Sequence, residues 1–340
     1  IVDNALRDFK LSGIALPPAQ RERYKAVMQE LSSLHAKFEE NLLDATNAWN
    51  IRITDPARLA GLPDSAVALA KQTAEREGQE GWVFNLEYPS YYPVLTYADD
   101  RALRRELYTA YVTRASDEGP HAGQWDNGPI MEQILALRHE AAQLLGFANY
   151  AERSIATKMA QSTDQVMQFL TDLAERSLPR ARADLDEVRA FARDQHGAGD
   201  LESWDIPYYS EKLRQHKYAI SQEELKPYFP ETRVLPGMFA VVNRLYGLDI
   251  AEVQGVDTWH PDVRFYEIKD ADGRLRGRFY LDLYARPHKR GGAWMDDCIA
   301  RRMTADGLQT PVAYLTCNFS PPIGKNPALF THDEVITLFH

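Results

Sequence analysis

A regular spacing of apolar residues between Tyr24 and Trp49 constrains the fold of this chain most strongly. Apolar side chains recur there every three or four residues, which places them on one face of an α-helix. These positions are Tyr24, Val27, Met28, Leu31, Leu34, Phe38, Leu42, Ala45 and Trp49. Pro17 and Pro18 come before the run, where the start of a helix tolerates proline. The spacing therefore predicts one long amphipathic helix.

The same helical spacing recurs in three later segments of the chain. It is found at 103–111, at 134–144 and at 166–188. Short segments that contain glycine and proline separate the helices, and they are Gly61–Pro63, Gly119–Pro120, Gly128–Pro129 and Gly197–Gly199. No internal repeat or low-complexity linker is present. Residues 1–255 are therefore expected to be mostly helical.

The pattern changes near residue 256, where apolar and polar residues begin to alternate. The alternation covers 263–265 and 279–283, and its apolar members are Val263, Phe265, Phe279, Leu281 and Leu283. Asp270–Gly273 lies between the two runs and predicts the turn of a β-hairpin. Val312–Phe319 predicts a further short strand. These segments predict a small antiparallel sheet.

The last residues of the chain predict a capped helix that ends in histidine. Thr331 and Glu334 have the spacing of a capping box, in which each side chain bonds the backbone N–H of the other. The apolar residues expected to be buried are Val335, Ile336, Leu338 and Phe339. A lone histidine at such a helix end is more often a core or capping residue than a metal ligand, so His340 has two interpretations at this point.

Composition limits the class of protein. At 340 residues the chain is expected to form about two domains, and 44% hydrophobic and 26% charged residues are typical of a globular protein. No apolar run approaches the ~20 residues that span a bilayer, so no membrane segment is expected. The net charge of −10 argues against a nucleic-acid-binding protein.

The two cysteines are too few to form a disulfide framework. Cys298 and Cys317 are therefore expected to be free thiols, as in a reducing cytoplasm. A nucleophilic role for Cys298 is not favoured, because the preceding Asp296 and Asp297 would raise the pKa of its thiol. The chain begins at Ile1 without a signal-peptide pattern, and both of its ends are expected to be interior to a longer protein.

Several ordered runs resemble one known family. They are 6–13, 204–212, 260–267, 289–298, 316–319 and the final run 330–340. Together these runs resemble the thimet oligopeptidase family, the M3 metallopeptidases, and the resemblance extends along the whole chain. The final run looks like the entry to that family's zinc-binding helix, in which the motif His-Glu-x-x-His supplies two zinc ligands and a general base.

The resemblance implies a mainly α fold in which long helices form one side of a deep channel. A small antiparallel sheet would lead into a truncated zincin-type metal helix. It also implies an N-terminal helical part at 1–97 and a truncated M3 peptidase region at 98–340. Within that region, 98–255 would be helical, and 256–340 would hold the sheet and the start of the zinc helix.

The resemblance further implies one Zn²⁺ per complete enzyme, with His340 as the first ligand. The general-base Glu, the second His and the third ligand would lie beyond residue 340, so no catalytic residue is expected within the chain. The complete protein would be a cytoplasmic metalloendopeptidase that hydrolyses internal bonds of short peptides. Metal-assisted attack of water on the scissile carbonyl is the expected reaction. The isolated chain is expected to be inactive and to need the missing C-terminal part of the same enzyme.

Thr316, Cys317, Asn318 and Phe319 are the expected substrate-binding residues. Zincins bind peptides as an added strand along a sheet edge, and this run lies just before the metal helix. A purely structural strand is an equal alternative. The basic segment 286–292 likewise has two interpretations, a mobile loop near the cleft or a plain solvated turn.

Two other functions are considered beside the peptidase. The isolated chain would act only as a non-catalytic helical module that binds peptides or serves as a scaffold. Alternatively, the complete protein would be a zincin carboxypeptidase of similar helical build, although the matching runs are those of the oligopeptidases. Short peptides are the expected substrates in the favoured interpretation, and neither nucleic acid nor a membrane is an expected partner.

Overall fold

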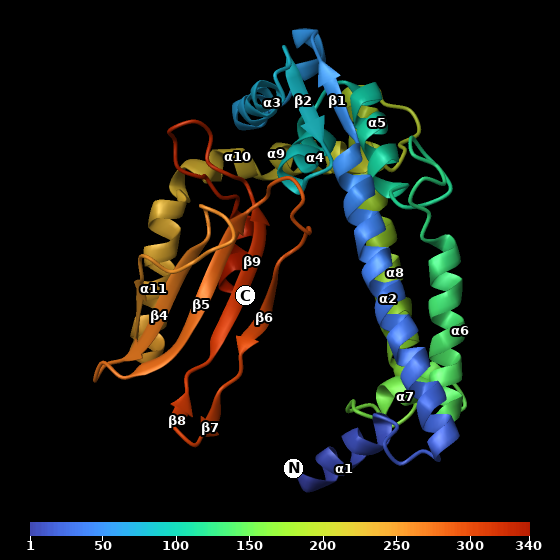
Figure 1. Cartoon of the computed structure of the whole chain (residues 1–340). Helices are drawn as coiled ribbons and strands as arrows, with labels where there is room; N and C mark the ends of the chain where they lie inside the picture. Colours follow the sequence, from blue (N-terminus) through green and yellow to red (C-terminus); the bar gives the residue numbers. More distant parts are fainter. The chain divides into compact units, whose positions relative to one another are not determined.

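The computed structural model describes all 340 residues and is mainly helical (Figure 1). The helices are α1 (Val2–Leu11), α2 (Pro18–Ala48), α3 (Asp64–Arg76), α4 (Tyr88–Tyr97), α5 (Arg101–Val112), α6 (Gly128–Leu144), α7 (Tyr150–Ile155), α8 (Thr163–His196), α9 (Ile206–Tyr218), α10 (Gln222–Leu225), α11 (Glu231–Tyr246) and α12 (His332–Phe339). Short 3-10 helices lie at η1 (Pro56–Leu59) and η2 (Lys226–Tyr228). The strands are β1 (Asn50–Ile53), β2 (Trp82–Asn85), β3 (Leu248–Glu252), β4 (Arg264–Asp270), β5 (Leu275–Tyr284), β6 (Trp294–Ile299), β7 (Arg302–Thr304), β8 (Gly307–Gln309) and β9 (Val312–Phe319).

The chain divides into two compact units. The first contains Ile1–Ala45 and Thr109–Asp200, and the second contains Thr46–Tyr108 and Leu201–His340. These bounds differ from the family-based division at 97 and 98, because α2 and α5 each contribute residues to both units. The division into 1–97 and 98–340 remains a prediction about family regions.

The first unit is built on the long helix that the apolar spacing predicted. α2 begins at Pro18, as expected, and Tyr24, Val27 and Leu31 pack in one core with α6 residues. The α6 members of that core are Ile134, Leu137 and Ala141. The helical prediction is confirmed, but Met28 and Leu42 are exposed.

α8 is also confirmed as a long helix of the first unit. The Ser162 side chain caps its start by accepting a hydrogen bond from the backbone N–H of Gln165. Its end is set by Gly197, whose φ of 61° lies in the left-handed region that favours glycine. The predicted periodic segment 166–188 lies within these limits.

The second unit contains a two-stranded sheet that the sequence did not predict. β1 and β2 pair antiparallel, with Ile51 opposite Phe84. Both strands lie within the segment expected to be mostly helical. Phe84 is buried in a core with α4 and α5, whose members there include Val94 and Leu103.

The five-stranded sheet of the second unit positions the candidate site. Its strand order is β3-β4-β5-β9-β6. The hairpin of β4 and β5 is confirmed, with the connection after Asp270. The sheet is mainly antiparallel, with one difference from the prediction: β9 runs parallel to β5. Two parallel neighbouring strands need a crossover connection between them. Here the connection from β5 to β9 contains β6, β7 and β8.

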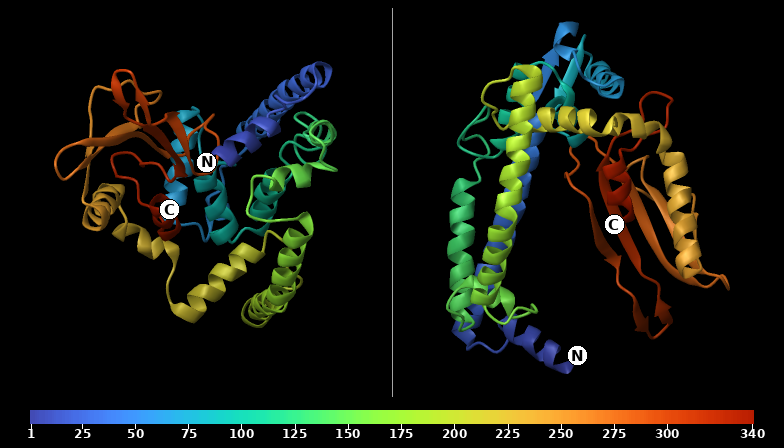
Figure 2. Two further views of the ribbon diagram at one scale, coloured as in Figure 1. Left: turned by 90° about the horizontal axis from the view of Figure 1, so that it is seen from below. Right: turned by 180° about the vertical axis from the view of Figure 1, so that it is seen from behind.

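One face of this sheet is covered by α11 and α12 (Figure 2). Val234 and Leu235 of α11 and Leu338 of α12 form a core with inward-facing residues of the strands. The strand members of the core include Tyr266, Leu281, Leu283, Cys317 and Phe319. This packing holds α12 against β9. Across the whole chain, no helix has both the length and the apolar character that crossing a membrane requires.

Candidate functional site

The start of α12 has the geometry that its sequence predicted. The backbone N–H of Glu334 donates to the Thr331 hydroxyl at 3.1 Å, and the backbone N–H of Thr331 donates to Glu334 Oε2 at 2.7 Å. Both halves of the capping box are therefore present.

Glu334 also ties α12 to the end of β9. Its Oε1 accepts a hydrogen bond from the backbone N–H of Ser320 at 2.7 Å and one from the Ser320 hydroxyl at 3.1 Å. Burial raises the pKa of this carboxyl group, while the hydrogen bonds from Thr331 and Ser320 oppose the rise. A single buried side chain therefore caps the helix and fixes it to the sheet.

His340 lies at the exposed C-terminal end of α12. Its backbone N–H donates to the carbonyl of Ile336 at 2.9 Å, and the residue is exposed. Leu338 is buried as expected and Val335 is partly buried. Ile336 and Phe339, which were expected to be buried by the other part of the enzyme, are 54% and 50% exposed in this chain.

The residues of this chain do not form a zinc site on their own. A catalytic zinc ion needs three protein ligands. No group of three or more His, Cys, Asp and Glu side chains could hold a metal ion in the structure. His340 as a zinc ligand therefore remains a prediction about a longer protein.

The four residues expected to bind substrate divide between the two faces of β9. Cys317 and Phe319 are buried in the core beneath α11 and α12, where burial raises the pKa of the Cys317 thiol to about 12. Thr316 and Asn318 alternate with them and lie on the opposite face. Cys298 and Cys317 are both free thiols, as predicted.

β9 is paired on both sides along only part of its length. Along Val312–Thr316, β5 pairs with one side of β9 and β6 pairs with the other, so this part of β9 is not an edge. Beyond Thr316, β9 pairs with β5 only. The pairing of β6 with β9 runs from Trp294 opposite Thr316 to Ile299 opposite Val312. Along Val312–Thr316, the open edge of the sheet therefore belongs to β6.

β6 is an exposed edge strand. Its residues from Met295 to Ile299 are exposed, and no strand of the chain pairs with its outer side. An edge strand of this kind presents backbone N–H and C=O groups to another extended chain. The sequence did not predict β6, although the run 289–298 contributed to the family resemblance.

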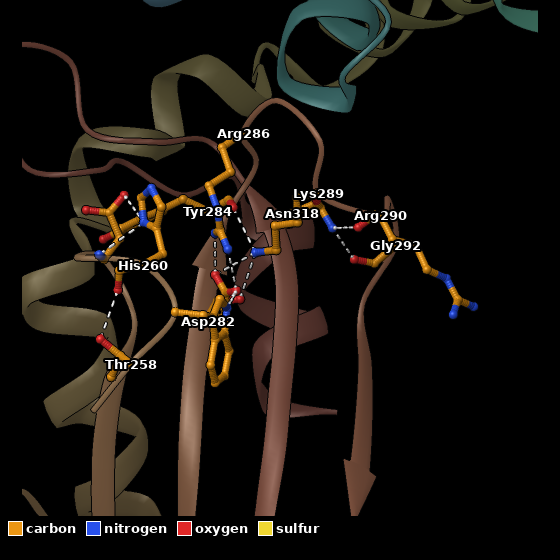
Figure 3. A network of polar contacts seen from close by, with 11 residues as sticks. Thr258, His260, Asp282, Tyr284, Arg286, Lys289, Arg290, Gly292 and Asn318 are labelled. Atoms are coloured by element: carbon orange, nitrogen blue, oxygen red, sulfur yellow. Dashed lines mark hydrogen bonds and ion pairs between the residues drawn. The ribbon is translucent and has the colours of Figure 1, made fainter. Parts of the chain in front are cut away.

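Asp282 organises the loop that leads from β5 to β6 (Figure 3). It is 3% exposed and accepts four hydrogen bonds from three side chains. Arg286 donates from Nη1 at 2.6 Å and from Nη2 at 2.8 Å. Lys289 Nζ donates at 2.8 Å and Trp259 Nε1 at 3.0 Å. The carboxylate thereby connects β5 with the loop and with the segment before β4.

The charges around Asp282 determine its protonation state. Burial tends to raise the pKa of Asp282, but hydrogen bonds from Arg286 and Lys289 outweigh it and lower the pKa to about 2. Lys289 Nζ also donates to the carbonyl oxygens of Asp282 at 3.1 Å and Tyr284 at 2.8 Å. Its side chain is 6% exposed. The idea that 286–292 forms a plain solvated turn is therefore wrong for Lys289.

Asn318 holds the far end of the same loop. Its Nδ2 donates to the carbonyl oxygens of Arg290 and Gly292, each at 2.8 Å. The Arg290 guanidinium lies 5.1 Å from the ring centre of Trp294, the first residue of β6. The amide nitrogen of Asn318 is therefore already bonded to the backbone of this loop. No periodic signal in the sequence could identify this contact, because its partners lie far apart along the chain.

Comparison with known proteins identifies what the chain resembles. Residues 94–340 match Peptidase family M3. The chain is 59% identical over 340 residues to oligopeptidase A of Salmonella typhimurium and 58% identical to oligopeptidase A of Escherichia coli. Each match covers 100% of this chain and 50% of the relative. The resemblance inferred from the sequence runs, to the M3 family and to bacterial oligopeptidase A within it, is confirmed.

A more distant relative is named for a different activity. The chain is 33% identical over 334 residues to dipeptidyl carboxypeptidase of Escherichia coli, a match that covers 98% of this chain and 48% of the relative. The chain spans about half the length of the curated relatives it matches.

Proposed function

The chain belongs to peptidase family M3, and we propose that it is part of a zinc-dependent oligopeptidase that hydrolyses internal bonds of short peptides. The observation that carries this proposal is the high identity to oligopeptidase A along the whole chain. Short peptides would be the substrates and the cytoplasm the location of the complete enzyme.

His340 is the one zinc ligand that we propose within this chain. It lies at the exposed end of a helix that Glu334 and Leu338 fix to the sheet, which positions the backbone from which the imidazole extends. The remaining ligands would come from the other part of the same enzyme. We therefore propose that the isolated chain is inactive, because its own residues do not complete a metal site.

The part of the chain that would bind the peptide is the outer edge of β6. A peptide added to this edge would be held by backbone hydrogen bonds, which do not depend on its side chains. Two observations support this assignment. β6 is exposed and lies beside β9, and the residue that follows β9, Ser320, is hydrogen-bonded to Glu334 of α12. Thr316, Cys317, Asn318 and Phe319 remain the proposed substrate-binding residues of β9, next to this edge, and beyond Thr316 their strand pairs with β5 only.

Cleavage of a peptide with a blocked carboxyl end tests the activity. The full-length enzyme would be incubated with a short, C-terminally amidated peptide that carries a fluorophore and a quencher. We expect cleavage at an internal bond, loss of cleavage with a chelator and recovery with zinc. Undiminished cleavage by the metal-free enzyme would rule out the metallopeptidase assignment.

The same assay separates the two rival functions. A dipeptidyl carboxypeptidase would release dipeptides from a free carboxyl end and leave the amidated peptide intact. A non-catalytic module would bind the peptide without cleaving it, even as the full-length protein. Mass spectrometry of the products distinguishes these outcomes, because only an oligopeptidase yields fragments cut at internal bonds of the amidated peptide.

A further inference from the structure

The long helix α8 of the first unit is packed within this chain only near its C-terminal end. Its buried residues are Val188 and Ala192. None of its residues belongs to the core that α2 and α6 share in the same unit. The part of α8 that precedes Val188 is therefore a helix that the chain itself leaves largely uncovered.

This uncovered part of α8 has a polar side and an apolar side. Residues three or four positions apart lie on the same face of a helix. By this spacing, the polar side carries Asp164, Gln168, Thr171 and Glu175. The apolar side carries two adjacent rows, which are Met167, Leu170, Ala174 and Leu178 in one row and Val166, Phe169 and Leu173 in the other. Such an arrangement is typical of a helix whose apolar side packs against other side chains.

The apolar side of α8 is nevertheless open to solvent in this chain. The exposed fractions are 61% for Met167, 66% for Phe169, 50% for Leu170, 53% for Leu173 and 48% for Leu178. Single exposed apolar side chains are common on protein surfaces, but these five lie along one side of one helix. A continuous apolar patch of this kind marks a surface that contacts another protein segment.

The helix also lacks other sources of stability in this part. Pro179 lies inside it and removes one backbone hydrogen bond of the helix. The ion pair of Arg180 with Asp184 is exposed on both sides, so it contributes little. Most helical stability in proteins comes from tertiary packing of an apolar face. The apolar side of α8 therefore needs a partner to hold the helix in place.

The length of the relatives indicates which partner this is. The match to oligopeptidase A of Salmonella typhimurium covers 100% of this chain but only 50% of the relative. An enzyme of that length has as much polypeptide again outside the matched region. A covalently attached segment has a high effective concentration, whereas a second copy would lose translational and rotational freedom on binding. The attached segment is therefore the favoured occupant.

We propose that the apolar side of α8 packs against apolar side chains from the other part of the same enzyme. This inference rests on the proposal that the chain is part of a longer peptidase, and it is independent of the zinc chemistry. The proposed metal and peptide-binding residues all lie in the second unit, so α8 gives the first unit a contact surface of its own.

Thiol labelling of the full-length enzyme tests this contact directly. Leu170→Cys places a thiol on the apolar side of α8, and the matched control Gln168→Cys places one on the polar side of the same helix. Both positions are exposed in this chain. We expect the thiol at 170 to react at least about tenfold more slowly than the thiol at 168, because a covered site reacts only when it opens. Equal rates at the two positions would overturn the inference.

Mass spectrometry of proteolytic peptides assigns the label to its position. It separates a thiol introduced in α8 from Cys298, which is exposed in this chain. The rates for positions 168 and 170 are therefore compared without interference from the natural thiols.

Truncation of the same side chain gives a second, independent measurement. Alanine has the highest helix propensity, so Leu170→Ala would leave an exposed site unchanged or more stable. At a covered site the same change leaves a cavity and destabilises the enzyme. We expect the thermal midpoint of the full-length enzyme to fall by about 2–4 °C or more in Leu170→Ala and not to fall in Gln168→Ala. A midpoint that does not fall in Leu170→Ala would contradict the inference.

The dependence of labelling on enzyme concentration identifies the occupant. Protection of the thiol at 170 is expected to be the same in dilute and in concentrated enzyme, because the covering segment belongs to the same polypeptide. Protection that is lost as the enzyme is diluted to a monomer would assign the surface to a second copy and overturn the proposal.

These outcomes separate the inference from the proposed activity. If the full-length enzyme cleaves no peptide but protects position 170, the peptidase activity fails while the contact at α8 stands. If the enzyme cleaves peptides and positions 168 and 170 react equally fast, only the inference about α8 is wrong.

Discussion

Replacement of Asp282 by asparagine should destabilise the second unit more than any surface charge change. The substitution removes one buried negative charge and leaves two cationic groups, those of Arg286 and Lys289, without their counter-ion. The Lys289 side chain has almost no access to water, so it cannot replace the lost partner by hydration. The remaining Asn amide would accept with one oxygen only.

Two estimates give the size of the expected loss in the free energy of unfolding. The pKa of Asp282 is about 2 against an ordinary value of 3.8, which corresponds to about 2 kcal/mol of stability. Removing one partner of a buried ion pair typically costs about 3–5 kcal/mol, because a charge is left uncompensated. We therefore expect a loss of about 3 kcal/mol at neutral pH.

The effect should depend on pH in a defined direction. The folded pKa of Asp282 lies below its unfolded value, so its charge stabilises the chain fully above about pH 5. The contribution is lost as the pH falls through 3.8 towards 2. The difference between the unaltered chain and Asp282→Asn should therefore shrink over this range.

Urea unfolding of the 340-residue chain, followed by tryptophan fluorescence, measures the free energy of unfolding. Trp259 reports on the network, because its indole donates to Asp282. The matched control is Asp270→Asn, since Asp270 pairs with the more exposed Arg276 and should cost only about 0–1 kcal/mol. The reasoning would be refuted if both variants lost the same free energy of unfolding. It would also be refuted if the loss in Asp282→Asn did not change with pH.

Three further predictions concern the helix cap, the thiols and the metal. Thr331→Ala removes the cap of α12 and should lower the free energy of unfolding by about 1 kcal/mol in the same urea assay; no change would show that the cap is unimportant. The exposed Cys298 should react with a thiol reagent in the folded chain and the buried Cys317 only after unfolding, whereas fast labelling of both would contradict the described core. The isolated chain should hold no stoichiometric zinc by elemental analysis, and one tightly bound zinc per chain would disprove this.

The sequence predicted those elements whose signals are local. The long helix from Pro18 follows from the spacing of Tyr24, Val27 and Leu31, which repeats within each turn. The capping box of Thr331 and Glu334 is confined to one helical turn, and it forms as expected. Such features depend on residues close together in the chain, so periodicity and spacing are sufficient to find them.

The parts that the sequence did not predict depend on distant residues. β6 has exposed residues on both faces at Met295 and Asp296, so it lacks the alternation that identifies a half-buried strand. The position of β9 inside the sheet depends on that missed strand. Likewise, Asp282 is recognisable only once Trp259 and Lys289 are brought together by the fold.

The outer side of α12 shows what an apolar helix pattern does and does not specify. Ile336 and Phe339 have the apolar character of buried residues, yet this chain provides nothing that covers them. The apolar pattern of a helix predicts which faces are suited to burial, without specifying the residues that cover them.

The zinc content of the full-length enzyme tests the central claim most directly. Elemental analysis would be made on the unaltered enzyme and on His340→Ala, with His332→Ala as the control, an exposed histidine at the other end of the same helix. We predict one zinc per unaltered enzyme, retention in His332→Ala, and loss of both zinc and peptide cleavage in His340→Ala. Full zinc content and cleavage in His340→Ala would contradict the claim that α12 carries the first ligand of a peptidase metal site.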